Sequence, residues 1–98
     1  MTNTYTLQQA TGLEWLKIEL QRVHRDPGTL TVVPTKGGKL RAFLGGEPLL
    51  TYTPDTETVR LPDGSVYDRR LRTLREPSGV IWWGTPIGYV LQRALRMM

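Results

Sequence analysis

The chain contains no cysteine and only one histidine, His24. The lack of cysteine excludes disulfide bonds, thiolate nucleophiles and sulfur ligands for a metal, and it fits a reducing compartment. A nucleophilic serine needs a partner base, yet Ser65 and Ser78 fall in predicted turns and there is no second histidine. We place His24 in the last turn of a helix, where a cation is favourable for structural reasons. We therefore predict a protein that is not an enzyme.

Metal-binding and phosphate-binding motifs are also missing. The His, Asp and Glu residues do not show the spacing of a zinc or calcium site, and no glycine-rich nucleotide motif occurs. Most carboxylates stand in turns or beside arginines, where capping and charge pairing account for them. We expect no cofactor and no metal. A carboxylate pair that meets across the chain, as in a glycosidase, is a weaker alternative.

Long apolar runs are absent from the sequence. The longest ones, such as Val80–Trp83, have only a few residues, whereas a membrane-spanning helix needs about 20. The N-terminal segment MTNTYTLQQATG lacks the basic start and the apolar stretch of a secretion signal. We expect a soluble, cytoplasmic protein without a membrane partner.

The charge of the chain is basic and evenly spread. Its 98 residues include 13 Lys and Arg against 9 Asp and Glu, which gives a net charge of +4. The halves before and after position 50 hold 6 basic and 4 acidic residues and 7 and 5, so each carries +2 and there is no basic tail. A basic balance favours an anionic partner, but alone it describes solubility and association. The length fits one domain, residues 1–98, with a single modest core.

Helix signals stand near both ends of the chain. Thr11–Glu14 matches a capping box, which predicts a helix from about residue 12 to residue 24. Asp26–Gly28 then combines a proline and a glycine that end it. Thr85–Pro86 predicts the start of a second helix, with threonine as the cap and proline at the first helical position.

Short β-prone segments lie between the two helices. Turn signals separate them at Gly37-Gly38, Gly45-Gly46, Pro54 and Pro62. Val80–Trp83 is expected to be a final, largely buried strand. Residues 67–75 fit either a strand to about Leu71, which we favour, or a helix. The order predicts an α+β domain of two layers, in which an antiparallel β-meander of five or six strands is flanked by an N-terminal and a C-terminal helix.

The first predicted helix carries apolar residues on two opposite sides. Its core stripe consists of leucines at positions 13, 16 and 20, with Val23. Trp15, Ile18 and Arg22 fall on the other side. Either the N-terminal arm or the C-terminal helix covers this side, or it binds a partner, since tryptophan and arginine often anchor interfaces.

Two adjacent tryptophans, Trp82 and Trp83, form the second candidate surface. In a strand their rings point to opposite faces of the sheet, so one enters the core and the other lies on the open face. An arm or a second copy of the chain covers that ring, or it stacks on a base or fills a pocket of a partner. On the second helix, Tyr89 and Arg93 point away from the apolar arc.

A cluster of arginines forms the third candidate surface and consists of Arg69, Arg70, Arg72 and Arg75. At least two of the four share a solvent-facing side, and the planar guanidinium group matches carboxylate or phosphate. We assign them as a candidate site for an anion or a nucleic acid. The alternative is a solvated strand edge that charge protects from pairing with other strands.

The sequence favours a small non-enzymatic interaction protein of the regulator, inhibitor or adaptor type. Its predicted partner is another protein with an acidic patch, bound through an apolar and basic surface made of Trp15, Ile18, Arg22, Trp82, Trp83, Tyr89 and Arg93. A homodimer is compatible with the same surface. RNA or DNA is the alternative partner, although no RRM, KH or helix-turn-helix module is evident. An unrecognised enzyme ranks third.

Overall fold

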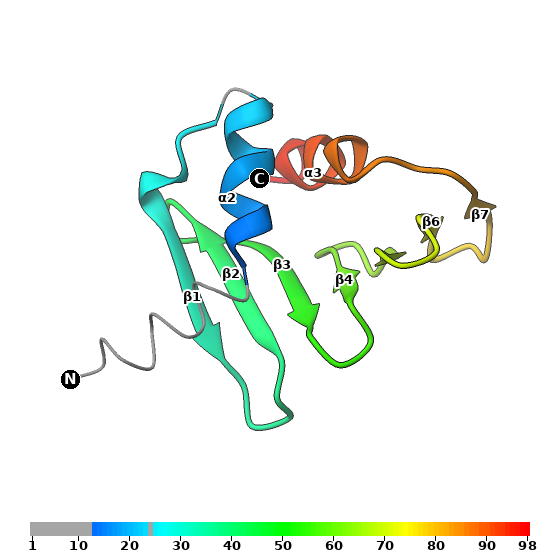
Figure 1. Cartoon of the computed structure of the whole chain (residues 1–98), viewed down its shortest axis with the longest axis horizontal. Coiled ribbons are helices and arrows are strands. Elements are labelled where there is room, and N and C mark those ends of the chain that lie inside the picture. The colour runs from blue at the N-terminus through cyan, green and yellow to red at the C-terminus, as the bar shows by residue number, and fades with distance from the viewer. Residues whose placement is uncertain (1–12, 24) are drawn as a thin grey trace.

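The structure, a computed structural model, describes residues 13–23 and 25–98 and combines helices with an antiparallel sheet (Figure 1). Its elements are α2 (Glu14–Arg22), the short 3-10 helix η1 (Pro27–Thr29), β1 (Leu30–Pro34), β2 (Leu40–Leu44), β3 (Glu47–Thr53), β4 (Thr58–Arg60), β5 (Val66–Asp68), β6 (Thr73–Arg75), β7 (Ile81–Trp82) and α3 (Ile87–Arg96). The described strands form one sheet in chain order, and each neighbouring pair is antiparallel. The predicted α+β fold with a meander between two helices is confirmed, with seven strands instead of five or six.

The turn between β2 and β3 shows why the glycine pairs predict the corners correctly. Leu44 pairs with Glu47, so only Gly45 and Gly46 connect the two strands. Their φ angles are 60° and 85°, in the left-handed region that a two-residue turn of this twist requires at both positions. Glycine adopts this region without the clash that a β-carbon would cause.

The additional strand results from a break inside residues 67–75. The carboxylate of Asp68 accepts hydrogen bonds from the backbone N–H groups of Arg70 (2.8 Å) and Leu71 (3.0 Å). Arg72 then has a φ of 57°, which is uncommon for a residue with a β-carbon. This turn separates β5 from β6, so the favoured strand ends at Asp68 instead of about Leu71, and the alternative of a helix is wrong. An Asx turn in place of a glycine or proline explains why the break is hard to see in the sequence.

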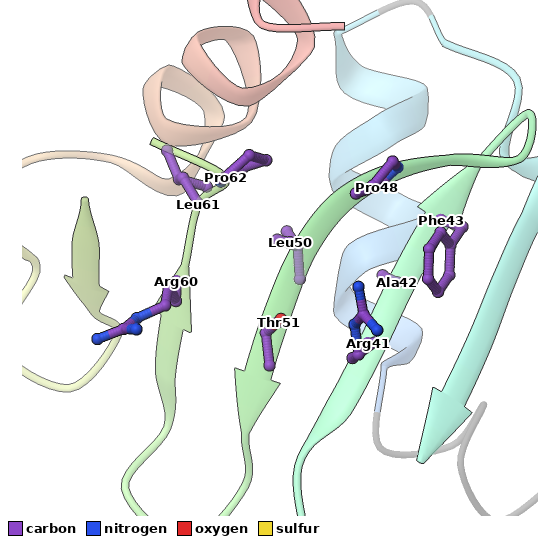
Figure 2. Close-up of a pocket in the computed structure, with 9 residues that line it drawn as sticks. All are labelled: Arg41, Ala42, Phe43, Pro48, Leu50, Thr51, Arg60, Leu61 and Pro62. Carbon is purple, nitrogen blue, oxygen red and sulfur yellow. The ribbon is translucent and has the colours of Figure 1, made fainter. Parts of the chain in front are cut away.

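The core lies between the sheet and the two helices. Both helices contribute to it, with Leu13, Leu16 and Leu20 from the α2 side and Val90, Leu91 and Ala94 from α3. The buried strand residues share one face and include Leu40, Ala42, Leu50, Tyr52, Val59, Tyr67 and Leu74. The predicted leucine stripe is therefore the core face of the first helix. Both described helices pack on this core face. Figure 2 views the sheet from its other face, the open face, and shows α2 behind the strands.

Both helices begin later than the sequence signals predict. The N-cap of α2 is Leu13, without a side-chain cap, while Thr11, Gly12 and His24 lie outside the described residues. The N-cap of α3 is Pro86, with extended backbone at a ψ of 150°. The hydroxyl of Thr85 donates to the Trp82 carbonyl at 3.3 Å instead of capping the helix. Within the described residues, neither helix is long and apolar enough to cross a membrane.

Candidate interaction surfaces

The end of the sheet formed by β7 exposes four large apolar residues in succession. The exposed fractions are 48% for Val80, 46% for Ile81, 54% for Trp82 and 74% for Trp83. The prediction of a largely buried strand with one tryptophan in the core is therefore wrong. We call the group Trp82, Trp83, Pro86 and Tyr89 the tryptophan edge.

The strand register explains why Trp82 is exposed although it belongs to the apolar face of the sheet. Leu74, which is fully buried, is the cross-strand partner of Trp82, so both point to the face that carries the helices. Helix α3 does not extend over β7 (Figure 1). The helices therefore cover Leu74 but not Trp82.

A shallow apolar groove runs between β7 and the start of α3. It has a volume of about 400 Å³ and is lined by Trp82, Trp83, Gly84, Thr85, Pro86 and Tyr89. Tyr89 is 45% exposed at its rim. Two indole rings, a phenol ring and a proline ring thus present one continuous apolar surface, of the kind that anchors protein interfaces.

A chain of polar contacts fixes the orientation of Trp82. Its indole N–H donates to Oε2 of Glu76 at 2.9 Å. The same oxygen accepts from Arg93 Nη1 at 3.3 Å, and Arg93 Nη2 binds Asp63 Oδ2 at 3.2 Å. The predicted partner residue Arg93 therefore holds the groove in place from behind, with two carboxylates as its own partners.

Charge pairing shifts the acid–base equilibria in this chain of contacts. Partial burial would raise the pKa of Asp63, but a hydrogen bond from the Ser65 N–H and the nearby Arg93 guanidinium lower that pKa below its usual value. Desolvation of Arg93 is likewise outweighed by Asp63 and Glu76, which raise the pKa of its guanidinium. Both ions are thus stabilised by the folded state.

A buried tyrosine supports the segment that follows the tryptophans. Tyr67 is 2% exposed, and its hydroxyl donates to the Thr85 carbonyl at 2.6 Å. Burial raises the pKa of Tyr67, so the phenol keeps its proton near neutral pH. This bond joins the centre of the sheet to the residues immediately before α3.

The second group of predicted partner residues lies on α2, away from β7 (Figure 1). Trp15 is half-buried: its ring meets Tyr52 edge-on at 5.4 Å, and the Arg69 guanidinium lies over it at 4.2 Å. These contacts come from β3 and the β5–β6 turn and not from the C-terminal helix, which was one of the two proposed covers. The other proposed cover, the N-terminal arm, lies outside the described residues. Ile18 and Arg22 are exposed, and Arg22 pairs with Glu19 at 3.4 Å. The single combined surface expected from the sequence is therefore split in two.

The four clustered arginines are dispersed by the turn between β5 and β6. Arg69 and Arg70 both pair with Glu57, at 3.6 and 3.0 Å. Arg72 lies at the turn, and Arg75 belongs to β6 and points to the open face of the sheet. The cluster therefore does not form one anion site.

Sequence reasoning did not single out two other arginines, Arg41 and Arg60, or the aromatic ring next to them, Phe43. All three lie on the open face, around a hollow that Figure 2 shows. The alternation of side chains along a strand could have identified both arginines. Each one is next to a core residue in its strand, so its side chain must point to the face opposite the core.

The chain matches no protein-family model, and no curated protein or solved structure is significantly similar to it. Within residues 13–23 and 25–98, no three His, Asp or Glu side chains gather as metal ligands. That the protein is not an enzyme and needs no cofactor stays a prediction.

Proposed function

We propose that this chain is a small, non-enzymatic interaction protein that binds another protein through the tryptophan edge. The observation that carries the proposal is the run of exposed apolar residues from Val80 to Trp83, beside an apolar groove. Leaving such a surface in water is unfavourable, and large exposed apolar patches mark interaction sites.

The occupant that fits this surface is an extended, apolar segment of a partner protein. β7 is the last strand of the sheet, and its outer backbone edge has no strand partner among the described residues. An added strand would satisfy those backbone groups, and its alternate side chains would enter the groove. Exposed Arg72 near the groove, whose carbonyl accepts the Thr85 N–H, favours a carboxylate beside the apolar residues of the segment.

The contacts behind the groove favour tight binding because they hold its wall in position before a partner arrives. Since Glu76 already accepts the Trp82 indole N–H, what that ring offers to a ligand is its carbon face. A side chain that is already ordered loses less conformational entropy on binding than a free one.

The matched variants Trp83→Ala and Ile18→Ala test this proposal. Both remove a large exposed apolar side chain, one in the tryptophan edge and one on α2. We expect Trp83→Ala to weaken the complex with a purified partner about thirtyfold, since an anchoring aromatic contributes about 2 kcal/mol or more. Titration calorimetry measures both affinities, and Ile18→Ala should bind like the unmodified chain.

Partner candidates come from a pull-down in which the unmodified chain and Ile18→Ala retain a protein that Trp83→Ala loses. Equal retention by all three proteins would contradict the proposal. Sedimentation equilibrium tests whether a second copy of the chain occupies the tryptophan edge instead. If the unmodified chain is a dimer and Trp83→Ala is a monomer, the second copy covers the edge, and the proposal of a different partner protein is wrong.

A further inference from the structure

The open face of the sheet carries a row of residues that crosses all seven described strands. Successive cross-strand partners are Val33, Arg41, Thr51, Arg60, Val66, Arg75 and Ile81. Its three basic members, Arg41, Arg60 and Arg75, are the arginine row. They stand on every second strand, so neighbouring ones have α-carbons about 10 Å apart, twice the spacing of adjacent strands.

The arginine row is exposed and has no counter-charge of its own. Among the described residues none of the three forms an ion pair, and their cross-strand partners are Thr, Val and Ile. Two carboxylates near the ends of β4 and β5 have other partners. Asp68 accepts two backbone N–H groups, and Glu57 binds Arg69 and Arg70. Three like charges on one face favour a ligand with several negative charges.

A hollow with an aromatic wall lies between the first two members of the row (Figure 2). It measures about 300 Å³, and its lining includes Arg41, Phe43, Thr51 and Arg60. The Arg41 guanidinium lies 5.1 Å from the centre of the Phe43 ring. A flat pair of this kind is a stacking surface for a base, because guanidinium planes and aromatic rings both stack on bases.

We propose that the open face binds single-stranded nucleic acid. The arginine row contacts successive parts of the phosphate backbone, and one base stacks at the Arg41–Phe43 pair over the hollow. An acidic protein segment would use the charges but not the stacking surface. A duplex presents few unstacked bases to a flat sheet. The site is separate from the tryptophan edge, so the two proposals can fail independently.

Fluorescence anisotropy with a labelled oligothymidine of about 20 nucleotides tests the proposal. The logarithm of the affinity should fall with the logarithm of the salt concentration with a slope of about −2, because each of three phosphate contacts contributes about −0.7. Between about 50 and 200 mM salt the affinity should thus fall roughly twentyfold. Arg60→Gln should reduce the slope by about 0.7. Phe43→Leu should weaken binding about fivefold without changing the slope.

The charge-matched control removes three arginines that do not lie on the open face. The variant R41Q/R60Q/R75Q should lose binding, whereas R22Q/R25Q/R96Q, with the same net charge, should keep most of it. Equal losses would show that net charge alone attracts the probe and would overturn the site. So would an unmodified chain that does not bind at about 50 mM salt.

Two competitors identify the class of ligand. A polyglutamate peptide that displaces the oligothymidine at equal charge concentration would assign the face to acidic protein segments and overturn the proposal. A duplex that competes as well as the single strand would also overturn it. Circular dichroism and melting curves of every variant confirm that losses do not come from unfolding, and Arg60→Gln alone, at an exposed position, serves if the triple variant fails to fold.

Discussion

The two ends of the sheet differ in how well the helices cover the same row of apolar residues. On the helix-bearing face, successive cross-strand partners are Leu40, Tyr52, Val59, Tyr67, Leu74 and Trp82. The first five are at most 5% exposed, whereas Trp82 is 54% exposed. The strand pattern is the same throughout, so the position at which the helices end decides which residue becomes surface.

The strands themselves also differ between the two ends. β2 and β3 have 5 and 7 residues, whereas β5, β6 and β7 have 3, 3 and 2. Short strands contribute few backbone hydrogen bonds, so the placement of β7 depends more on side chains. The contacts from Asp63 through Arg93 and Glu76 to Trp82 provide this support. The end of the sheet with β2 and β3 is thus stabilised by its buried core, whereas β7 is held in place by polar contacts beside it.

The largest expected effect on stability comes from truncating a buried member of this apolar row. Leu74→Ala removes a fully buried side chain and should lower the free energy of unfolding by about 3 kcal/mol. Trp83→Ala, a larger truncation at an exposed position, should change it by less than about 0.5 kcal/mol. Urea unfolding measures both. Similar losses for the two variants would mean that the tryptophan edge is covered in the free protein.

An intermediate effect is expected for Trp15→Ala. Trp15 packs against Tyr52 and Arg69, so its truncation should cost about 2 kcal/mol of stability, less than for a fully buried tryptophan. A helix face reserved for a partner would instead leave the stability unchanged. Ile18→Ala, on an exposed part of the same helix, is the control and should stay within about 0.5 kcal/mol. If Trp15→Ala is as stable as the control, the side of α2 that carries Trp15 is again a candidate surface for a partner.

The smallest effect concerns the ion pairs that border the uncovered end. The folded state lowers the pKa of Asp63, so its contribution is present above the unfolded value, about 3.9, and is lost as the pH falls through the lower folded value. At about pH 7, Asp63→Asn should therefore lower the free energy of unfolding by less than about 1 kcal/mol, and with it the melting temperature. The difference in melting temperature between the variant and the unmodified chain should shrink towards about pH 2.5.

Asp55→Asn is the matched control for this pH dependence. Asp55 is exposed in a turn, and no ion pair involves its carboxylate among the described residues. Its melting temperature should follow that of the unmodified chain across the same pH range. A difference for Asp63→Asn that grows as the pH falls would contradict the assigned pKa direction.

Local patterns in the sequence predicted the architecture well and the binding surfaces only in part. The leucine stripe of the first helix and the glycine pair between β2 and β3 each depend on neighbours within a few residues, so their structure follows from local chemistry. The exposure of Trp82 and the cover over Trp15 depend on residues far away in the chain. Sequence periodicity therefore identified which residues are apolar, but not which of them the fold would hide.

Composition and local pattern by themselves determined an α+β chain whose antiparallel meander is flanked by helices, because side-chain periodicity and turn chemistry act over a few residues. Only the tertiary structure decided that the four clustered arginines separate and that Arg41, Arg60 and Arg75 align on one face. The physical reason is strand register: residues many positions apart become neighbours only when hydrogen-bonded strands fix which pairs face each other.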